Sequence, residues 1–305
     1  MNEIQNCVGI DITYSKLQFV EIERRNNSYL VENLGQTYFS PQVDFKEMNE
    51  STPLDQLQTA YQEIVIRHPI KSNFVSFTLP QELFITVQLP YDANLTHDEI
   101  KEEFNWELSQ LFPFVKVDEL AIKFYELNGT LHSGKNNALI VALNKKYLML
   151  IKSFCQKNNL TPKLVDSSAI TANGFINNFI NGEKRKLIHL FNSRHSISLF
   201  INIESKPSYV KVFPKQDEKF LSKIIYELTR ENIRAIITNP SVKALITGED
   251  LESELISEIG RATELVFERI NPFEILKFKS DFKNTEIIPE QFGSFISSAA
   301  IATRF

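Results

Sequence analysis

The sequence predicts a two-lobed α/β fold in which a small α/β subdomain is inserted into the first lobe. Two runs typical of β-hairpins, at residues 8–22 and 187–203, each open a stretch in which helical and strand patterns alternate. Between them, residues 81–164 contain paired strands and a helix of their own. We therefore expect five parts: a first-lobe core at 1–80, the inserted subdomain at 81–164, a linking helix at 165–185, a second lobe at 186–285, and a C-terminal helix at 286–305 that returns to the first lobe.

The first lobe is expected to consist mainly of strands. Apolar and polar residues alternate in runs that predict strands at 8–12, 17–22 and 29–31, and a β-rich run predicts another at 74–79. A further β-rich run at 83–89 predicts the first strand of the insertion. Residues 53–67 instead carry apolar side chains at helical spacing, which predicts an amphipathic helix. Ser51 or Thr52 is the expected N-cap of this helix, and Pro69 follows its last turn.

The inserted subdomain contains a strong helix signal. Thr96 followed by Glu99 is the capping-box arrangement, and it precedes apolar residues at helical spacing, namely Ile100, Phe104, Leu108 and Leu111. Pro113 ends this helix. Residues 117–127 and 137–143 alternate like a strand pair joined through Asn128 and Gly129.

The remaining elements alternate between helix and strand. Helices are predicted at 145–157, 167–180, 217–230, 249–260 and 293–303, and strands at 163–166, 187–191, 196–203, 209–213, 233–238 and 264–267. Asp166 is the expected N-cap of the second of these helices, and an active-site role is the alternative. A charged break at 182–186 is the best boundary between the two lobes.

Composition excludes several functions. The formal net charge is −5 without a long block of either sign, so we expect no nucleic-acid binding. No run is long and apolar enough for direct membrane insertion, the first residues are polar, and the two cysteines, Cys7 and Cys155, are too few for a disulfide framework. The expected location is the cytoplasm. The five histidines show no metal-ligand spacing, and glycine makes up only 9 of the 305 residues.

Several segments, taken in order, resemble one family. They are Val-Gly-Ile-Asp-Ile at 8–12 within the hairpin 8–22, the helix 96–114 with Trp-Glu and Phe-Pro-Phe, the stretch 138–166, Asn-Pro-Phe at 271–273, and the Ala-rich end 299–304. Together they resemble the PilM-like, FtsA-related proteins of type IV pilus assembly, which belong to the actin-like ATPase superfamily. The resemblance covers most of the chain and implies the actin-like, ribonuclease H-like form of the two-lobed fold, with a second lobe reduced between 213 and 238.

The resemblance also implies a nucleotide site that this chain retains only in part. In that superfamily two hairpin turns hold the phosphates, and a carboxylate in the first turn holds Mg²⁺. The positions that match are Asp11 (the metal carboxylate), Thr13, Ser15 and Lys16 in the first hairpin, Asn192 and Ser193 in the second, and Gly248 at the adenosine motif. A structural alternative is that Asp11 caps its own turn. Lys16, Arg194 and His195 could form a small anion site or a solvated loop.

Three departures from the family pattern point to a lost ATPase. Thr13 stands where the family has a glycine in the first turn. In the second hairpin, residues 189–191 align with the family's Asp-x-Gly, so Phe191 stands in place of that glycine. Glu249 adds a negative charge directly after Gly248. We therefore expect no cofactor, although the family implies Mg-ATP. The alternative is a functional actin-like ATPase or a sugar-kinase-like phosphotransferase, which would need glycine-rich phosphate loops.

The resemblance implies a protein partner. PilM-like proteins hold the cytoplasmic peptide of the single-pass inner-membrane protein PilN, and by resemblance Trp106, Phe112 and Phe114 would bind it here. A core role for these aromatic residues is the structural alternative. The expected function is thus a cytoplasmic scaffold, recruited to the inner face of the membrane in pilus or secretion assembly and able to self-associate. A scaffold of an unrelated assembly is the third hypothesis.

Overall fold

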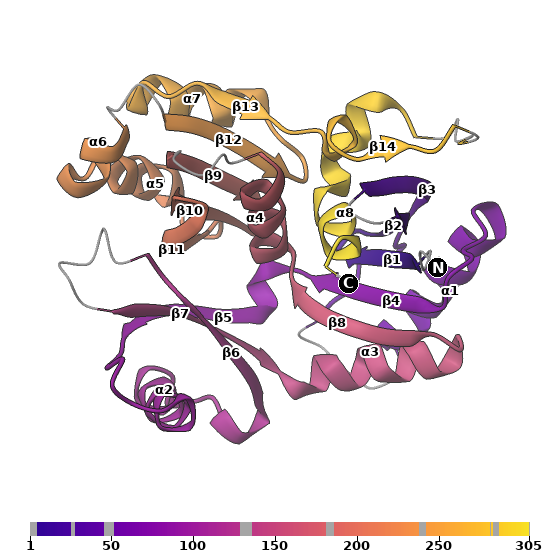
Figure 1. Ribbon diagram of the computed structural model, residues 1–305, viewed down its shortest axis with the longest axis horizontal. Coiled ribbons are helices and arrows are strands. Elements are labelled where there is room, and N and C mark those ends of the chain that lie inside the picture. Colours follow the sequence, from indigo (N-terminus) through magenta and orange to yellow (C-terminus); the bar gives the residue numbers. More distant parts are fainter. Residues whose placement is uncertain are drawn as a thin grey trace.

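The protein contains three β-sheets, two large and one small (Figure 1). The computed structural model describes residues 5–25, 28–45, 52–128, 136–180, 186–237, 242–280, 282 and 287–304. The orders are β14-β3-β2-β1-β4-β8, β11-β10-β9-β12-β13 and β5-β7-β6. We call these sheets, with their helices, the first lobe, the second lobe and the inserted subdomain. The expected cap Ser51, the turn at Gly129 and the break at 182–185 lie outside the described residues.

The first lobe is a mixed sheet covered on both faces. Its elements are β1 (Gln5–Ile12), β2 (Lys16–Arg25), β3 (Ser28–Tyr38), α1 (Thr52–Arg67), β4 (Phe74–Leu79), α3 (Lys145–Lys157), β8 (Thr161–Ser167) and β14 (Lys277–Phe278). Side chains alternate across a strand, so Val8, Ile10 and Ile12 of β1 pack together against α1 and α3. The predicted strands and both helices are confirmed, but Thr52 lies inside α1 rather than capping it.

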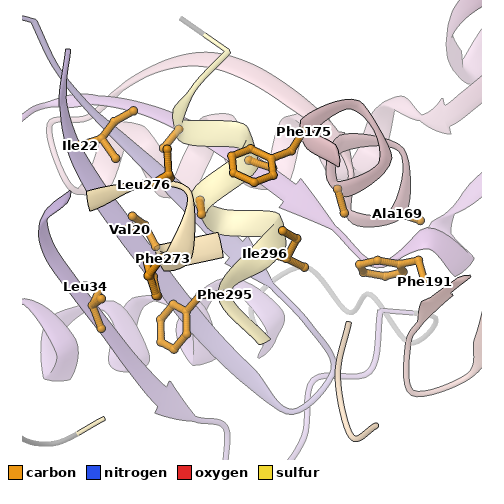
Figure 2. Packing of buried hydrophobic residues seen from close by; sticks show 14 of the residues in the cluster. Val20, Ile22, Leu34, Ala169, Phe175, Phe191, Phe273, Leu276, Phe295 and Ile296 are labelled. Atoms are coloured by element: carbon orange, nitrogen blue, oxygen red, sulfur yellow. The ribbon is translucent and has the colours of Figure 1, made fainter. Parts of the chain in front are cut away.

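Two helices, α4 (Ser168–Phe179) and α8 (Ile296–Ala302), lie between the two lobes. Figure 2 shows side chains of the first-lobe sheet, α4 and the C-terminal segment meeting around α8. The predicted terminal helix begins as a 3₁₀ turn, Pro289–Phe295, before α8. A Cβ on Gly9 would lie 2.0 Å from the Ser298 carbonyl oxygen, so glycine is needed where α8 rests on β1.

The predicted N-cap of α4 is wrong by one residue. Ser167 caps the helix, because its hydroxyl accepts a hydrogen bond from the Ile170 amide. The Asp166 carboxylate instead forms an ion pair with Arg304, next to the end of α8. Its other oxygen accepts a hydrogen bond from the adjacent Ser167 amide at 2.8 Å, so both oxygens are engaged outside the first turn of the helix.

The inserted subdomain is a three-stranded antiparallel sheet with one helix. It consists of β5 (Phe84–Pro90), α2 (His97–Leu111), β6 (Leu120–Glu126) and β7 (Asn137–Asn144). The capping box of Thr96 and Glu99 is confirmed. Ile100, Phe104 and Leu108 of α2 are buried against the sheet, as their spacing predicts.

The second lobe corrects one predicted strand. Its elements are β9 (Lys186–Asn192), β10 (Ser196–Ile203), β11 (Lys206–Pro214), α5 (Phe220–Thr229), α6 (Glu231–Ile237), β12 (Val242–Gly248), α7 (Ser253–Thr263) and β13 (Phe267–Arg269). The predicted strand at 233–238 is helix α6 as far as Ile237, because Ile233 and Ile236 are buried together at helical spacing. The strand that pairs in parallel with β9 is β12, which was not predicted from the sequence.

Candidate functional site

The two lobes open with hairpins whose turns have the same hydrogen bonds. In the first turn the Thr13 amide donates to the Lys16 carbonyl at 2.9 Å, and the Thr13 hydroxyl accepts from the Lys16 amide at 3.2 Å. In the second turn Ser193 makes both contacts with Ser196, at 2.9 and 3.2 Å. Thr13 and Ser193 are therefore equivalent, and each hydroxyl caps its own turn.

This equivalence shifts the expected alignment of the second hairpin by two residues. Counting back from the turns, Phe191 occupies the place of Asp11, whereas the sequence alignment put His189 there. The glycine of the family pattern corresponds to Ser193 rather than to Phe191. The second carboxylate is nevertheless absent, because Phe191 is an apolar side chain buried in the central core. Because the second turn contains no glycine, the sequence alone could not show which of its residues aligns with the glycine of the family pattern.

The space between the hairpins, where the family's phosphates would lie, is nearly filled. A cavity of about 20 Å³ remains among Asp11, Thr13, Phe191, Ser193, Gly248 and Glu249. Such a volume holds about one water molecule, whereas small-molecule pockets measure about 300–1,000 Å³. The tips of the two hairpins also touch, since the rings of Tyr14 and His195 meet edge to face at 4.6 Å. No polyphosphate fits between the turns in this conformation.

Charge in this region is balanced within the protein. The buried Asp11 carboxyl accepts a hydrogen bond from the Thr78 hydroxyl at 2.6 Å, and burial raises the pKa of Asp11 to about 7. Burial also raises the pKa of Glu249, whose carboxylate lies 3.8 Å from the Lys16 ammonium. Lys16 therefore faces a carboxylate of its own chain. Within the described ranges, no three His, Cys, Asp or Glu side chains are grouped to hold a metal ion. Asp11 does not cap the turn, because Thr13 does so.

The other predicted nucleotide residues gather at the same junction but contact one another. Gly248 ends β12 beside Asn192 and has a φ of +111°, and a Cβ there would lie 2.0 Å from the Asn192 carbonyl oxygen. The Asn192 side-chain amide donates to the backbone oxygens of Glu249 and Asp250. The Ser15 hydroxyl lies 3.4 Å from that of Thr13. Gly248 thus allows a close approach of backbone to backbone.

The inserted subdomain is tied to the second lobe by contacts that the sequence did not reveal. One carboxylate oxygen of Glu82 accepts hydrogen bonds from the hydroxyls of Ser193 and Ser196, the latter at 2.7 Å. The Gln88 carboxamide bonds to both the carbonyl and the amide of Val210, at 2.6 and 3.4 Å. These residues are far apart in the sequence, so no local sequence pattern predicts that they contact each other. Together these contacts hold the second hairpin against the subdomain.

An open cleft lies on the outer side of the same hairpin tips. Its volume is about 780 Å³, and its wall includes Tyr14, Phe84, Ile85, Val115, His195 and Val212. The first lobe, the inserted subdomain and the second lobe all contribute to it. Apolar walls with a few polar groups are typical of binding clefts.

The three aromatic residues expected to bind a partner are not in this cleft. Trp106 is 61% exposed and Phe114 is fully exposed, while Phe112 packs partly against the subdomain core. The cleft includes none of them, although Phe114 is followed directly by the cleft residue Val115. The core alternative is therefore wrong for Trp106 and Phe114.

A second open cleft lies beside Gly248. It measures about 640 Å³ and is lined by both lobes, including Lys16, Tyr38, Gly248, Leu251, Arg269 and Ser294.

None of the helices in the described part of the chain combines the length and apolar character that a membrane crossing requires.

Comparison with known proteins identifies the family and the fold. The family model for the type IV pilus assembly protein PilM matches residues 9–204. The structure resembles that of a PilM-PilN type IV pilus biogenesis complex, with 17% identity, a TM-score of 0.75 and coverage of 98% of each chain. A protein of Bacteroides thetaiotaomicron with an actin-like ATPase fold and unknown function is 13% identical, with a TM-score of 0.54 and coverage of 86% of this chain and 90% of that one.

A third similar structure comes from a secretion system. The cytoplasmic domain of EpsL, an inner-membrane component of the type II secretion system of Vibrio cholerae, is 8% identical, with a TM-score of 0.52 and coverage of 99% of this chain and 97% of that one. No curated protein matches by sequence. The predicted actin-like fold is confirmed.

Proposed function

Because this chain belongs to the family of the type IV pilus assembly protein PilM, we propose that it is an assembly scaffold that binds a peptide and does not hydrolyse ATP. One contrast carries the proposal. Between the hairpins about 20 Å³ is open, whereas on the outer side of the same hairpin tips about 780 Å³ is open. Bulky and charged side chains occupy the place of the phosphates, and they also build one wall of the peptide cleft. The five-part domain division remains part of the proposal with two changes, because α3 and β8 pack in the first lobe rather than in the insertion, and β14 joins the first-lobe sheet.

The proposed occupant of the cleft is an extended cytoplasmic segment of a single-pass inner-membrane protein. The similar structure is a PilM-PilN complex, which supports a PilN-like partner for this chain. The cleft is large enough for several side chains, and residues such as Ile85, Val115 and Val212 give it apolar walls. The protein would then act in the cytoplasm, held at the membrane by this partner.

Placing a charge in the apolar wall should abolish peptide capture. We expect Val115→Lys to weaken binding by about 30-fold or more, because the ammonium group must be desolvated when the peptide binds. The probe is a fluorescent peptide with the cytoplasmic sequence of the PilN-like protein from the same genome, followed by fluorescence anisotropy. Phe114→Lys is the matched control, since its side chain is next in sequence but lies outside the cleft. If Phe114→Lys abolishes capture and Val115→Lys does not, the partner binds the exposed aromatic residues instead.

Mg-ATP should not bind stoichiometrically. The phosphates would have to displace the Tyr14–His195 contact and separate Lys16 from Glu249, leaving carboxylates beside the polyphosphate. We expect calorimetric titration with Mg-ATP to give no saturable heat in the micromolar range. Stoichiometric uptake at micromolar concentration would contradict the proposed loss of ATPase function.

A functional ATP-binding protein is the second candidate, and the cleft beside Gly248 favours it. Its volume of about 640 Å³ would admit a nucleoside, and Lys16 and Arg269 line it. Titration with adenosine separates the two ideas, because adenosine lacks the phosphates that the hairpins exclude. Saturable adenosine binding without Mg-ATP binding would assign this cleft to a nucleoside and leave the loss of phosphate binding intact.

A further inference from the structure

Helix α2 exposes an acidic face with a tryptophan at its centre. The helix carries five carboxylates and one lysine, a net charge of −4. Trp106 lies opposite the buried stripe of the helix and is 61% exposed. Glu102, one helical turn before it, is exposed on the same face, whereas Glu103 is half-buried. A large aromatic side chain exposed among carboxylates is suited to contact an apolar group that is surrounded by positive charge.

Helix α3 exposes the complementary face. It carries four lysines and no acidic residue, a net charge of +4. Met149 lies opposite the buried residues of this helix and is 63% exposed. Lys145 and Lys146 lie one turn before it and Lys152 one turn after it. A thioether is a favourable contact for an aromatic ring.

The two helices do not neutralise each other within one chain. Lys145 donates to the backbone oxygen of Asp118, and Lys157 forms an ion pair with Asp55 of α1 at 3.7 Å. Across the described residues, no ion pair joins α2 to α3. Both helices lie along the lower edge of the molecule in Figure 1, away from the second-lobe sheet.

We propose that two copies of this chain associate through these helices, with α2 of each copy against α3 of the other. A two-fold axis between the helices places the acidic face with Trp106 on the basic face with Met149, and it repeats this contact in the opposite sense. Two such contacts form one interface that includes neither hairpin and reaches the edge of the peptide cleft at Lys146. Specific interfaces bury about 1,200–2,000 Å² in total, which two helix pairs can supply. The association does not require a bound peptide, so it can be tested on the chain alone.

The test is sedimentation of the full chain, with charge-swapped variants. The wild type should be a dimer in 50 mM NaCl and dissociate progressively in 500 mM NaCl, because salt screens exposed charges. An α2 variant, Glu102→Lys with Trp106→Lys, should be monomeric, with a dissociation constant raised by about 30-fold or more. An α3 variant, Met149→Glu with Lys152→Glu, should behave in the same way. All four side chains are exposed, and circular dichroism checks that the variants fold.

Mixing the two variants gives the decisive result. An α2 variant bears lysines that face the glutamates of an α3 variant, and their unmutated helices also remain complementary, so the mixture should form dimers. Tyr226→Lys with Glu231→Lys is the matched control on the exposed surface of the second lobe, and it should remain dimeric. A monomeric wild type in low salt, a mixture that stays monomeric, or assembly into open polymers larger than a dimer would each overturn the proposal.

Discussion

Replacing Gly9 with alanine is expected to lower the free energy of unfolding by about 3 kcal/mol or more. The new Cβ would lie 2.0 Å from the Ser298 carbonyl oxygen and 2.7 Å from the Ala302 amide nitrogen. Both are backbone atoms of α8, which cannot turn aside as a flexible side chain can. The helix must therefore move away from β1, and overpacking of this kind costs about 1–3 kcal/mol even where side chains can adjust.

Urea denaturation followed by circular dichroism measures this loss. Gly174→Ala is the matched control, because no atom outside its own stretch of helix backbone lies within 4 Å of a Cβ at that position. Gly174 lies inside α4, where alanine favours the helix, so this variant should be as stable as the wild type or up to about 1 kcal/mol more stable. An undiminished stability of Gly9→Ala would mean that α8 does not rest on β1, and the packing between the lobes would have to be reassigned.

Replacing Asp11 with asparagine should stabilise the protein at high pH by up to about 4 kcal/mol. Burial raises the pKa of Asp11 to about 7, whereas in the unfolded chain it ionises near its ordinary value of 3.8. The stability contributed by protonated Asp11 is therefore complete below about pH 4 and is lost as the pH rises towards 7. Above pH 7 the folded protein carries a buried carboxylate, and asparagine removes that penalty while its side-chain oxygen can still accept from Thr78.

Urea denaturation at several pH values between 4 and 8 tests the sign and the size of this effect. The advantage of Asp11→Asn should be largest at pH 8 and should shrink towards zero near pH 4. Asp118→Asn, at an exposed position, is the control and should follow the wild type at each pH. If the wild type were more stable than Asp11→Asn at pH 8, favourable interactions would stabilise the ionised Asp11 carboxylate. That result would contradict the prediction that this buried carboxylate destabilises the fold.

The fold was predictable wherever a local pattern and a buried face agree. The capping box of Thr96 starts α2, and the apolar stripe after it is the face that packs on the subdomain sheet. The prediction failed at 233–238, where isoleucines suit both a strand and a helix. Burial of Ile233 and Ile236 on the same side against α5 decided for the helix, and β12 took the strand position beside β9.

The candidate site was predictable as a set of residues but not as an arrangement. Asp11, Thr13, Ser193 and Gly248 do lie together, because the order of the hairpins places them there. That they fill the space rather than enclose a ligand depends on Tyr14 meeting His195 and on Lys16 facing Glu249. The exposure of Trp106, expected to bind a partner, likewise became clear only in the folded chain.

By itself, the sequence determined the family, the two-hairpin plan and the loss of glycine from both turns, since each depends on residue identity at short spacing. The tertiary structure alone decided which cavity remains open. A cavity is the volume left after segments distant in sequence have packed, and here Glu82 of the insertion, the second hairpin and β5 meet to leave the cleft beside Tyr14 open. No local sequence pattern predicts such a cavity, because its size depends on the distances between elements that come together only when the chain folds.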